Sequence, residues 1–200
     1  MAKAKKTEHG HLLIQGLRCS FPQLWQEDVQ ADGSKFGKGI KLLLCKEKDA
    51  DAIKLIKSEI SRIMKEKPKI AEVVKKSGES KMCLKDGDRE EYGDVKMLNC
   101  GNPKTIMVMH KNATPATEAD DPIYSGCMVN AKVEIWGQDN KYGKRINAKI
   151  IAVQFAGDAA SFDGGHVAPE VAADGFESLE DDDFGGSEDA ATPEADDFDF

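Results

Sequence analysis

Two neighbouring segments that alternate between apolar and polar residues constrain the fold of this chain most. Residues 124–137 read YSGCMVNAKVEIWG, residues 145–155 read RINAKIIAVQF, and the loop QDNKYGK joins them. A period of two places apolar side chains on one face of a strand. Two such strands joined by a short loop with Gly predict a β-hairpin. We therefore expect an antiparallel sheet with one buried face.

Four more segments are predicted to be strands, because each is an apolar run bounded by Gly, Pro, Asn or Asp. They are residues 11–21, 35–47, 94–100 and 105–111. Helices do not alternate with these strands, as a parallel α/β sheet would require. The sequence therefore predicts a mainly β fold, a small barrel of five or six strands.

A helical insertion interrupts the strands at about residues 49–77. Within it, Ile53, Ile56, Ile60 and Ile63 recur at steps of three and four, which predicts a helix with one apolar stripe. Pro68 ends this helix or begins a second, shorter one. The many lysines of the insertion fit a solvated face opposite the stripe better than a DNA-binding patch.

The charges divide the chain into a basic body and an acidic tail. All 28 Lys and Arg residues lie in residues 1–156 with 21 acidic residues, which gives +7, whereas residues 157–200 hold 15 acidic residues, which gives −15. The tail shows no helical or strand period and is expected to be disordered. We predict a flexible basic arm at 1–10, a barrel domain at 11–156 and a disordered acidic tail at 157–200.

Several classes of protein are not favoured by the sequence. It has no run of eighteen apolar residues and no signal peptide, so a cytoplasmic protein without membrane association is expected. Its five cysteines are odd in number and lack CxxC spacing, so we expect reduced thiols and no metal. Without HExxH, GxSxG or Walker A motifs, an enzyme is not expected, nor is a cofactor.

The outer face of the predicted hairpin is the first candidate site. By parity, Trp136 lies with Lys132 on the polar face of its strand, beside a loop rich in cations. An aromatic ring among cations on a sheet surface is the arrangement that binds single-stranded DNA. The alternative is that Trp136 closes the barrel end as a core residue. The candidate residues here are Trp136, Lys132, Lys141, Tyr142, Lys144 and Arg145.

A second group of aromatic residues and lysines surrounds the first long loop. The candidate residues are Trp25, Phe36, Lys35, Lys38 and Lys41. Phe21, in contrast, is predicted to belong to the core, because it continues the apolar strand before Pro22. Tyr92 lies among acidic residues and is the weakest stacking candidate.

The segment EADDFDF, at the end of the acidic tail, is the third candidate. Its carboxylates resemble phosphates and its rings resemble bases, so the tail is expected to compete with DNA at high local concentration. The residues are Asp196, Asp197, Phe198, Asp199 and Phe200. The alternative is a tail that only aids solubility.

Three stretches resemble one family: FGKGIKLLLCKEKDADAIKLI, LKDGD and YSGCMVNAKVEIWGQDNKYGKRINAKIIAVQFAGD. With them the chain is similar to bacteriophage single-stranded DNA-binding proteins with an OB-fold, a tailed-phage family first catalogued as a domain of unknown function. The resemblance covers about residues 8–165. The helical insertion is a departure from a minimal OB barrel.

The resemblance implies a five-stranded OB barrel that coats single-stranded DNA, with little sequence preference, during phage replication and recombination in the host cytoplasm. It also implies that the acidic tail recruits phage or host replication proteins. Some related proteins dimerise through the tail, so a homo-oligomer stays open. Two other functions stay open as well: a single-strand annealing recombination protein, and a DNA-mimicking regulator that binds proteins.

Overall fold

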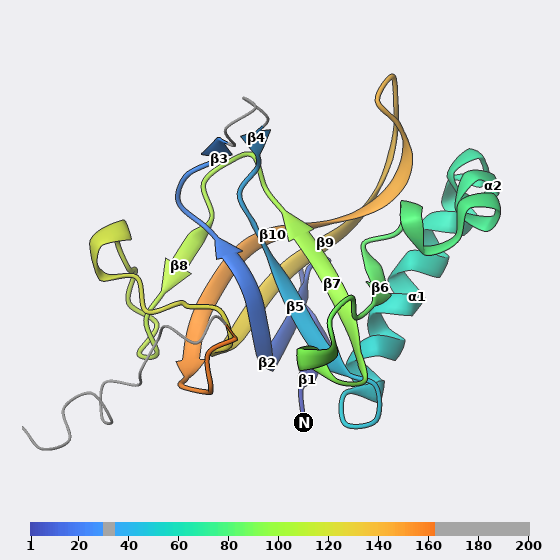
Figure 1. Cartoon of the computed structure of the whole chain (residues 1–200). Coiled ribbons are helices and arrows are strands. Elements are labelled where there is room, and N and C mark those ends of the chain that lie inside the picture. Colours follow the sequence, from blue (N-terminus) through green and yellow to red (C-terminus); the bar gives the residue numbers. More distant parts are fainter. Residues whose placement is uncertain (30–34, 163–200) are drawn as a thin grey trace, which may run out of the picture. The chain divides into compact units, whose positions relative to one another are not determined.

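A computed structural model of the chain describes residues 1–29 and 35–162. Its centre is a barrel of long strands (Figure 1). These are β2 (Leu12–Gln23), β5 (Gly39–Cys45), β7 (Val95–Gly101), β9 (Met128–Asn140) and β10 (Gly143–Gly157). Two helices, α1 (Ala50–Glu66) and α2 (Pro68–Ser77), lie between β5 and β7 in the sequence.

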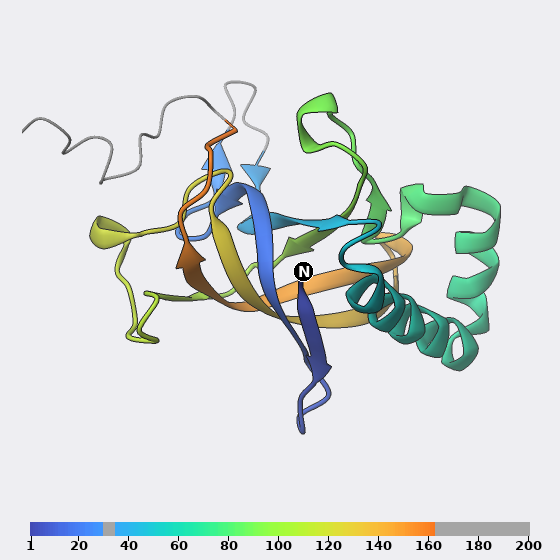
Figure 2. The same ribbon diagram turned by 90° about the horizontal axis from the view of Figure 1, so that it is seen from below.

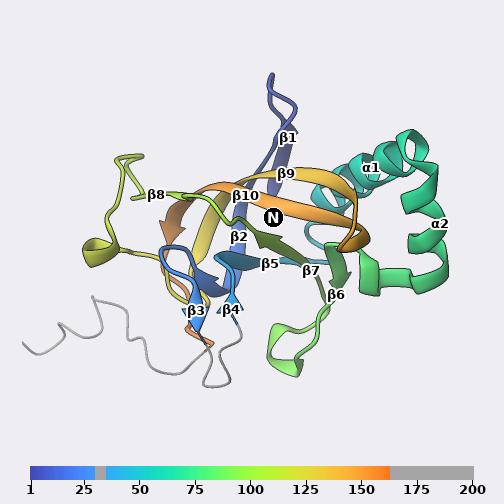
Figure 3. The same ribbon diagram turned by 90° about the horizontal axis from the view of Figure 1, so that it is seen from above.

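The strand pairing identifies the barrel. Neighbours run in the order β7-β5-β2-β9-β10, and each of these pairs is antiparallel. A short parallel pairing of β10 with β7, at Ala148↔Cys100 and Lys149↔Gly101, closes the ring. Figure 3 shows β2, β5, β7, β9 and β10 arranged around the barrel. A closed five-stranded barrel of this order is the OB-fold, so the predicted fold class is confirmed.

Short elements extend the barrel. The structure adds β1 (Lys3–Lys6), β3 (Asp28–Val29), β4 (Lys35–Phe36), β6 (Leu84–Asp86) and β8 (Met107–Met109). It also adds three single-turn helices, η1 (Gly78–Lys81), η2 (Glu90–Tyr92) and η3 (Glu118–Asp120). β6 pairs with β7, and β8 pairs in parallel with β10. Within the described parts of the chain, no helix is long and apolar enough to cross a membrane.

The helical insertion packs on the far end of the β9–β10 hairpin (Figures 1 and 3). The isoleucine stripe of α1 is buried, as predicted. Gly137 of β9 permits the close approach, because a Cβ there would lie 2.8 Å from side-chain carbons of both Ile63 and Ile70. Lys67, between the helices, donates from Nζ to the Gly137 carbonyl oxygen at 2.8 Å. The helices are thus fixed to the strand that carries Trp136.

The first ten residues differ from the prediction of a loose arm. Lys3–Lys6 form β1, which pairs with the start of β2 and projects with it from the barrel (Figure 2). The Ala2 amide donates to Asp49 Oδ1 at 2.6 Å, and Lys6 Nζ lies 2.6 Å from Glu59 Oε1. A four-residue strand made almost wholly of lysine carries no alternating signal. Its charges suit an edge strand that must resist pairing with other chains.

The hairpin loop is also shorter than predicted. Most of QDNKYGK is strand, since Asn140 pairs with Gly143 across a turn at Lys141 and Tyr142. Gly143 has φ +117°, a conformation that glycine adopts readily. The strands can therefore extend to the turn and hold its side chains far from the barrel centre.

Candidate nucleic-acid interface

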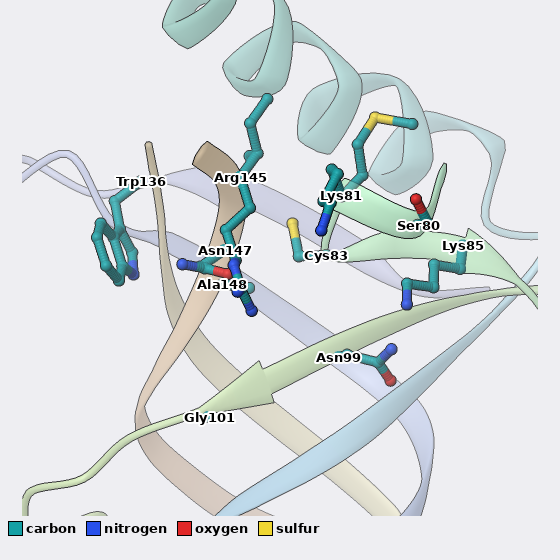
Figure 4. A pocket seen from close by; sticks show the side chains of 12 residues that line it. Ser80, Lys81, Cys83, Lys85, Asn99, Gly101, Trp136, Arg145, Asn147 and Ala148 are labelled. Atoms are coloured by element: carbon teal, nitrogen blue, oxygen red, sulfur yellow. The ribbon is translucent and has the colours of Figure 1, made fainter. Parts of the chain in front are cut away.

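The outer face of β9 carries the residues that parity assigned to it. Val129, Ala131, Val133 and Ile135 are buried in the barrel core, whereas Trp136 is 39% exposed. Trp136 is therefore a surface residue and does not close the core. Its indole stands on the side of the barrel formed by β9, β10 and β7 (Figure 4).

The strand register places a series of outward side chains on neighbouring strands. Lys41 of β5 lies opposite Asn99 of β7, and Asn147 of β10 lies opposite Trp136 of β9. β7 and β10 adjoin through the parallel pairing that closes the barrel. Phe21, at the end of β2, contacts Lys41. We call this series the outer band, defined by Phe21, Lys41, Asn99, Asn147 and Trp136.

An exposed aromatic residue stands at each end of the outer band. Four steps between strands separate β2 from β9 by this route, and at about 4.8 Å a step the band is roughly 19 Å long. Aromatic rings that stand apart on a basic surface can stack separate bases, while cations between them meet the phosphates. The band therefore has the layout of a single-strand binding surface.

Phe21 is the main correction among the aromatic residues. It was predicted to be core, yet the residue is 43% exposed. Its φ of +47° and a register shift between Ser20 and Gln23 turn the ring outward. Lys41 Nζ lies 4.8 Å from the ring centroid and Arg89 Cζ lies 4.5 Å from it. A left-handed conformation is costly for phenylalanine, which is typical of a functional position.

Trp136 stands where three hollows meet. A cavity of about 290 Å³ lies between β6 and β10, and we call it the seam cavity. A second hollow runs along residues 67–69 and 137–140, and a third lies beside residues 101–104. Trp136 contributes to the lining of all three. Its ring is therefore accessible from several directions.

The other residues predicted on the hairpin lie in three places: in the seam cavity, at the hairpin tip and along the strands. Arg145 lines the seam cavity with Trp136. Tyr142 is 72% exposed at the hairpin tip, with Lys141 Nζ 5.1 Å from its ring centroid. Lys144 forms an ion pair with Asp139 at 3.2 Å. Lys132 lies on the outer face of β9, four residues from Trp136, opposite Leu13 and Ala152 of the flanking strands.

The residues predicted around the first long loop do not form one site. Trp25 packs against the main core, and its Nε1 donates to Asp121 Oδ2 at 2.7 Å, so its ring is held away from the outer band. Lys41 belongs to the band, and Lys38 is half-buried just before β5. Lys35 and Phe36 form β4, but their side chains lie outside what the structure describes. Asp196, Asp197, Phe198, Asp199 and Phe200 also lie outside the described residues.

Several cations near the outer band were not singled out from the sequence. They are Lys81, Lys85, Arg89, Lys104 and Lys149. Lys85 of β6 lies opposite Met97 of β7, on the same outer face as Asn99. No pattern in the sequence points to these residues, because their position depends on how β6, β7 and β10 adjoin. The thiol of Cys83, also in the seam cavity, adds no charge at neutral pH, since burial raises its pKa to about 12.

The first residues after β10 are held against the barrel. We call residues 158–162 the strap. Tyr124 Oη donates to Asp158 Oδ1 at 3.0 Å, and the Phe162 amide donates to the Ser125 carbonyl oxygen at 3.2 Å. The Phe162 ring packs edge-on against Tyr92 at 5.1 Å, and Arg18 Cζ lies 4.0 Å from its centroid. The strap thus ties the start of the acidic segment to the face that carries Leu43 and Met97, next to Lys41 and Asn99.

Comparisons with known proteins agree with the fold. The family model of the ssDNA-binding protein of Enterobacter phage Enc34 matches residues 11–185. The solved single-stranded DNA-binding protein from bacteriophage Enc34 in complex with ssDNA is 25% identical, with a TM-score of 0.67, and covers 80% of this chain and 93% of that chain. Its C-terminal truncation is 27% identical, with a TM-score of 0.69, and covers 80% and 92%.

A further relative is the putative protein p50 of Acyrthosiphon pisum secondary endosymbiont phage 1. It is 35% identical over 164 residues, which are 78% of this chain and 88% of the relative. The resemblance seen in the sequence is thereby confirmed. The family model spans most of the chain, and the barrel has the order of an OB-fold. This chain belongs to the family of the ssDNA-binding protein of Enterobacter phage Enc34.

Proposed function

We propose that this protein binds single-stranded DNA along the outer band, with little sequence preference, during phage DNA replication and recombination. The observation that carries the proposal is the pair of exposed rings, Phe21 and Trp136, at the two ends of a band with cations beside it. The solved Enc34 relative, which shares the fold, is described as a complex with ssDNA. Membership in that family supports the same ligand here.

In the proposed mechanism the rings stack on bases and the cations meet phosphates. Stacking tolerates any base because every base has a π-face. Lys41 and Arg89 lie against the Phe21 ring. They are ion-paired with Asp88 at 3.1 Å and with Glu91 at 2.9 Å, so a phosphate beside that ring replaces these carboxylates. Arg145 and Lys85 serve the region near Trp136. Binding is expected to weaken with salt, because phosphate contacts release counterions.

The proposal includes a role for the acidic C-terminal segment. The strap holds residues 158–162 beside the outer band, and the acidic segment continues from there in the sequence. Residues 157–200 carry −15 and compete with phosphates for the band. Once DNA displaces the segment, it becomes available to basic surfaces of phage or host replication proteins.

The test is the equilibrium binding of a dye-labelled oligo-dT to the full chain and to residues 1–162, at low and at raised salt. Cutting after residue 162 keeps every contact of the strap. The proposal predicts binding by both proteins, loss of affinity with salt, and tighter binding by the shorter one at low salt. A peptide of residues 163–200 added separately should weaken that binding. Absence of binding by both proteins would refute the proposal.

A further inference from the structure

The helical insertion forms one wall of a groove beside Trp136. The groove has a volume of about 640 Å³ and is lined by residues 67–69, where α1 passes into α2, and by residues 136–140 of β9. We call it the helix groove. The end of the β9–β10 hairpin lies beside α2 in Figures 2 and 3. Since Trp136 lines both the seam cavity and this groove, the helix groove begins where the outer band ends.

The two walls of the groove are held together by close packing and a hydrogen bond. Gly137 follows Trp136, and a Cβ at this glycine would lie 2.8 Å from side-chain carbons of Ile63 in α1 and of Ile70 in α2. Both isoleucines are buried. Lys67 Nζ donates to the Gly137 carbonyl oxygen at 2.8 Å. The junction of the two helices is therefore fixed next to the strand position that carries the Trp136 ring.

The hairpin wall of the groove carries a chain of hydrogen-bonded amides. Asn147 Nδ2 donates to Gln138 Oε1 at 2.9 Å, and Gln138 Nε2 donates to Asn140 Oδ1 at 3.0 Å. The same Asn140 oxygen accepts the Tyr142 backbone amide at 3.0 Å. Asn147 lines the seam cavity, whereas Gln138 and Asn140 line the helix groove. A continuous polar surface therefore runs from the seam cavity through the groove to the hairpin tip.

The charges of the helix groove fit an anionic ligand. Lys69 is exposed in the groove, and within residues 1–29 and 35–162 it forms no salt bridge. Asp139, in the groove, pairs with Lys144 at 3.2 Å, and Glu66, next to the groove in the sequence, pairs with Arg62 at 2.6 Å. Lys69 is thus available to a phosphate. A lysine in a groove with an aromatic ring at its mouth is an arrangement that holds single-stranded DNA.

We propose that bound single-stranded DNA continues past Trp136 into the helix groove, so that the helical insertion forms part of the DNA-binding site. Trp136 then stacks on a base within the bound segment, Lys69 meets a phosphate beyond it, and the Gln138 and Asn140 amides border the path. The inference rests on the proposed function, because it extends the outer band. It gives the insertion, a departure from a minimal OB barrel, a direct role in binding.

The length of the oligonucleotide tests this extension. An OB-fold covers about 4–16 nucleotides, so a series of labelled oligo-dT spans that range. The shortest oligomers occupy the outer band alone, and only longer ones reach Lys69. Lys69→Ala should therefore bind the shortest oligomers as wild type does and the longest about 2- to 5-fold more weakly, the usual worth of an exposed ion pair. The slope of log K against log salt should become shallower by about 0.7 for the longest oligomers alone.

The experiment uses the full chain, and Lys75→Ala is the matched control. Lys75 is an exposed lysine in the last turn of α2 and is not among the residues that line the groove. Both variants should keep the thermal stability of wild type, and Lys75→Ala should match its affinity at every length.

Three results would overturn the extension into the groove and leave the proposed function intact. They are wild-type affinity of Lys69→Ala at every length, an equal loss at every length, and an equal loss in Lys75→Ala, which would reduce the effect to net charge. If wild type binds oligo-dT of no length, the proposed function itself fails.

Discussion

Replacing Phe21 by alanine tests the end of the outer band that the sequence did not reveal. Phe21 is 43% exposed, which leaves part of its ring available to a base, and Lys41 and Arg89 lie against the ring. One stacked base is worth about 1–3 kcal/mol, and Kd for oligo-dT should therefore rise about 5- to 140-fold. Loss of the two cation contacts and of the buried part of the ring should reduce the free energy of unfolding by about 1–3 kcal/mol. Since domains are usually stable by about 5–15 kcal/mol, the variant should remain folded.

The assay is a titration of labelled oligo-dT at fixed salt, with urea unfolding of each variant as a check on folding. Met107→Ala is the matched control, since Met107 is an exposed apolar side chain on β8, off the band. Phe21 and Trp136 stand at opposite ends of the band, and the cations against Phe21, Lys41 and Arg89, line none of the three hollows at Trp136. The free energies lost in Phe21→Ala and Trp136→Ala should therefore add in the double variant. If the folded Phe21→Ala protein binds oligo-dT within twofold of wild type, the Phe21 ring does not stack on a base and Phe21 does not belong to the DNA-binding surface.

Three further predictions concern charge, packing and pH. Lys85→Ala should make the slope of log K against log salt shallower by about 0.7, the value for one phosphate contact on a single strand, and an unchanged slope would remove Lys85 from the DNA path. Gly137→Ala should cost about 1–3 kcal/mol in urea unfolding, because the new Cβ would lie 2.8 Å from carbons of Ile63 and Ile70. Burial raises the pKa of Glu59, but hydrogen bonds from Lys6 and Arg62 outweigh it and hold that pKa below its usual value. This stabilisation is therefore present above the unfolded-state pKa of about 4.3 and is lost as the pH falls through the lower folded-state value. Lys6→Ala should reduce that loss on acidification, and identical pH profiles would contradict the coupling of β1 to α1.

The period of two in β9 allowed its faces to be predicted. Alternate residues from Val129 to Ile135 are buried, and Trp136 is exposed as parity requires. The buried face of α1 could be predicted in the same way, because isoleucines at steps of three and four mark one face of a helix whatever the surrounding strands do. Such signals are local, and they fix which side of an element meets the core.

Phe21 and Asn99 show two structural features that the alternation of residues along a strand cannot predict. Parity places Phe21 with Leu17 and Cys19 in the core, but a positive φ and a register shift reverse the direction of its side chain. Asn99 lines the seam cavity only because β7 changes its partner from β6 to β10 at this point. That change depends on the register between segments far apart in the sequence. Neither feature can be read from residue types alone.

The measurement that tests the central claim most directly is the intrinsic tryptophan fluorescence of the full chain during titration with oligo-dT, compared with the Trp136→Phe variant. The variant retains Trp25, which is packed on the core and bonded to Asp121. If single-stranded DNA stacks on the outer band, wild-type fluorescence falls on saturation and most of that fall disappears in the variant. A wild type that is not quenched, or a variant that is quenched equally, would contradict the account.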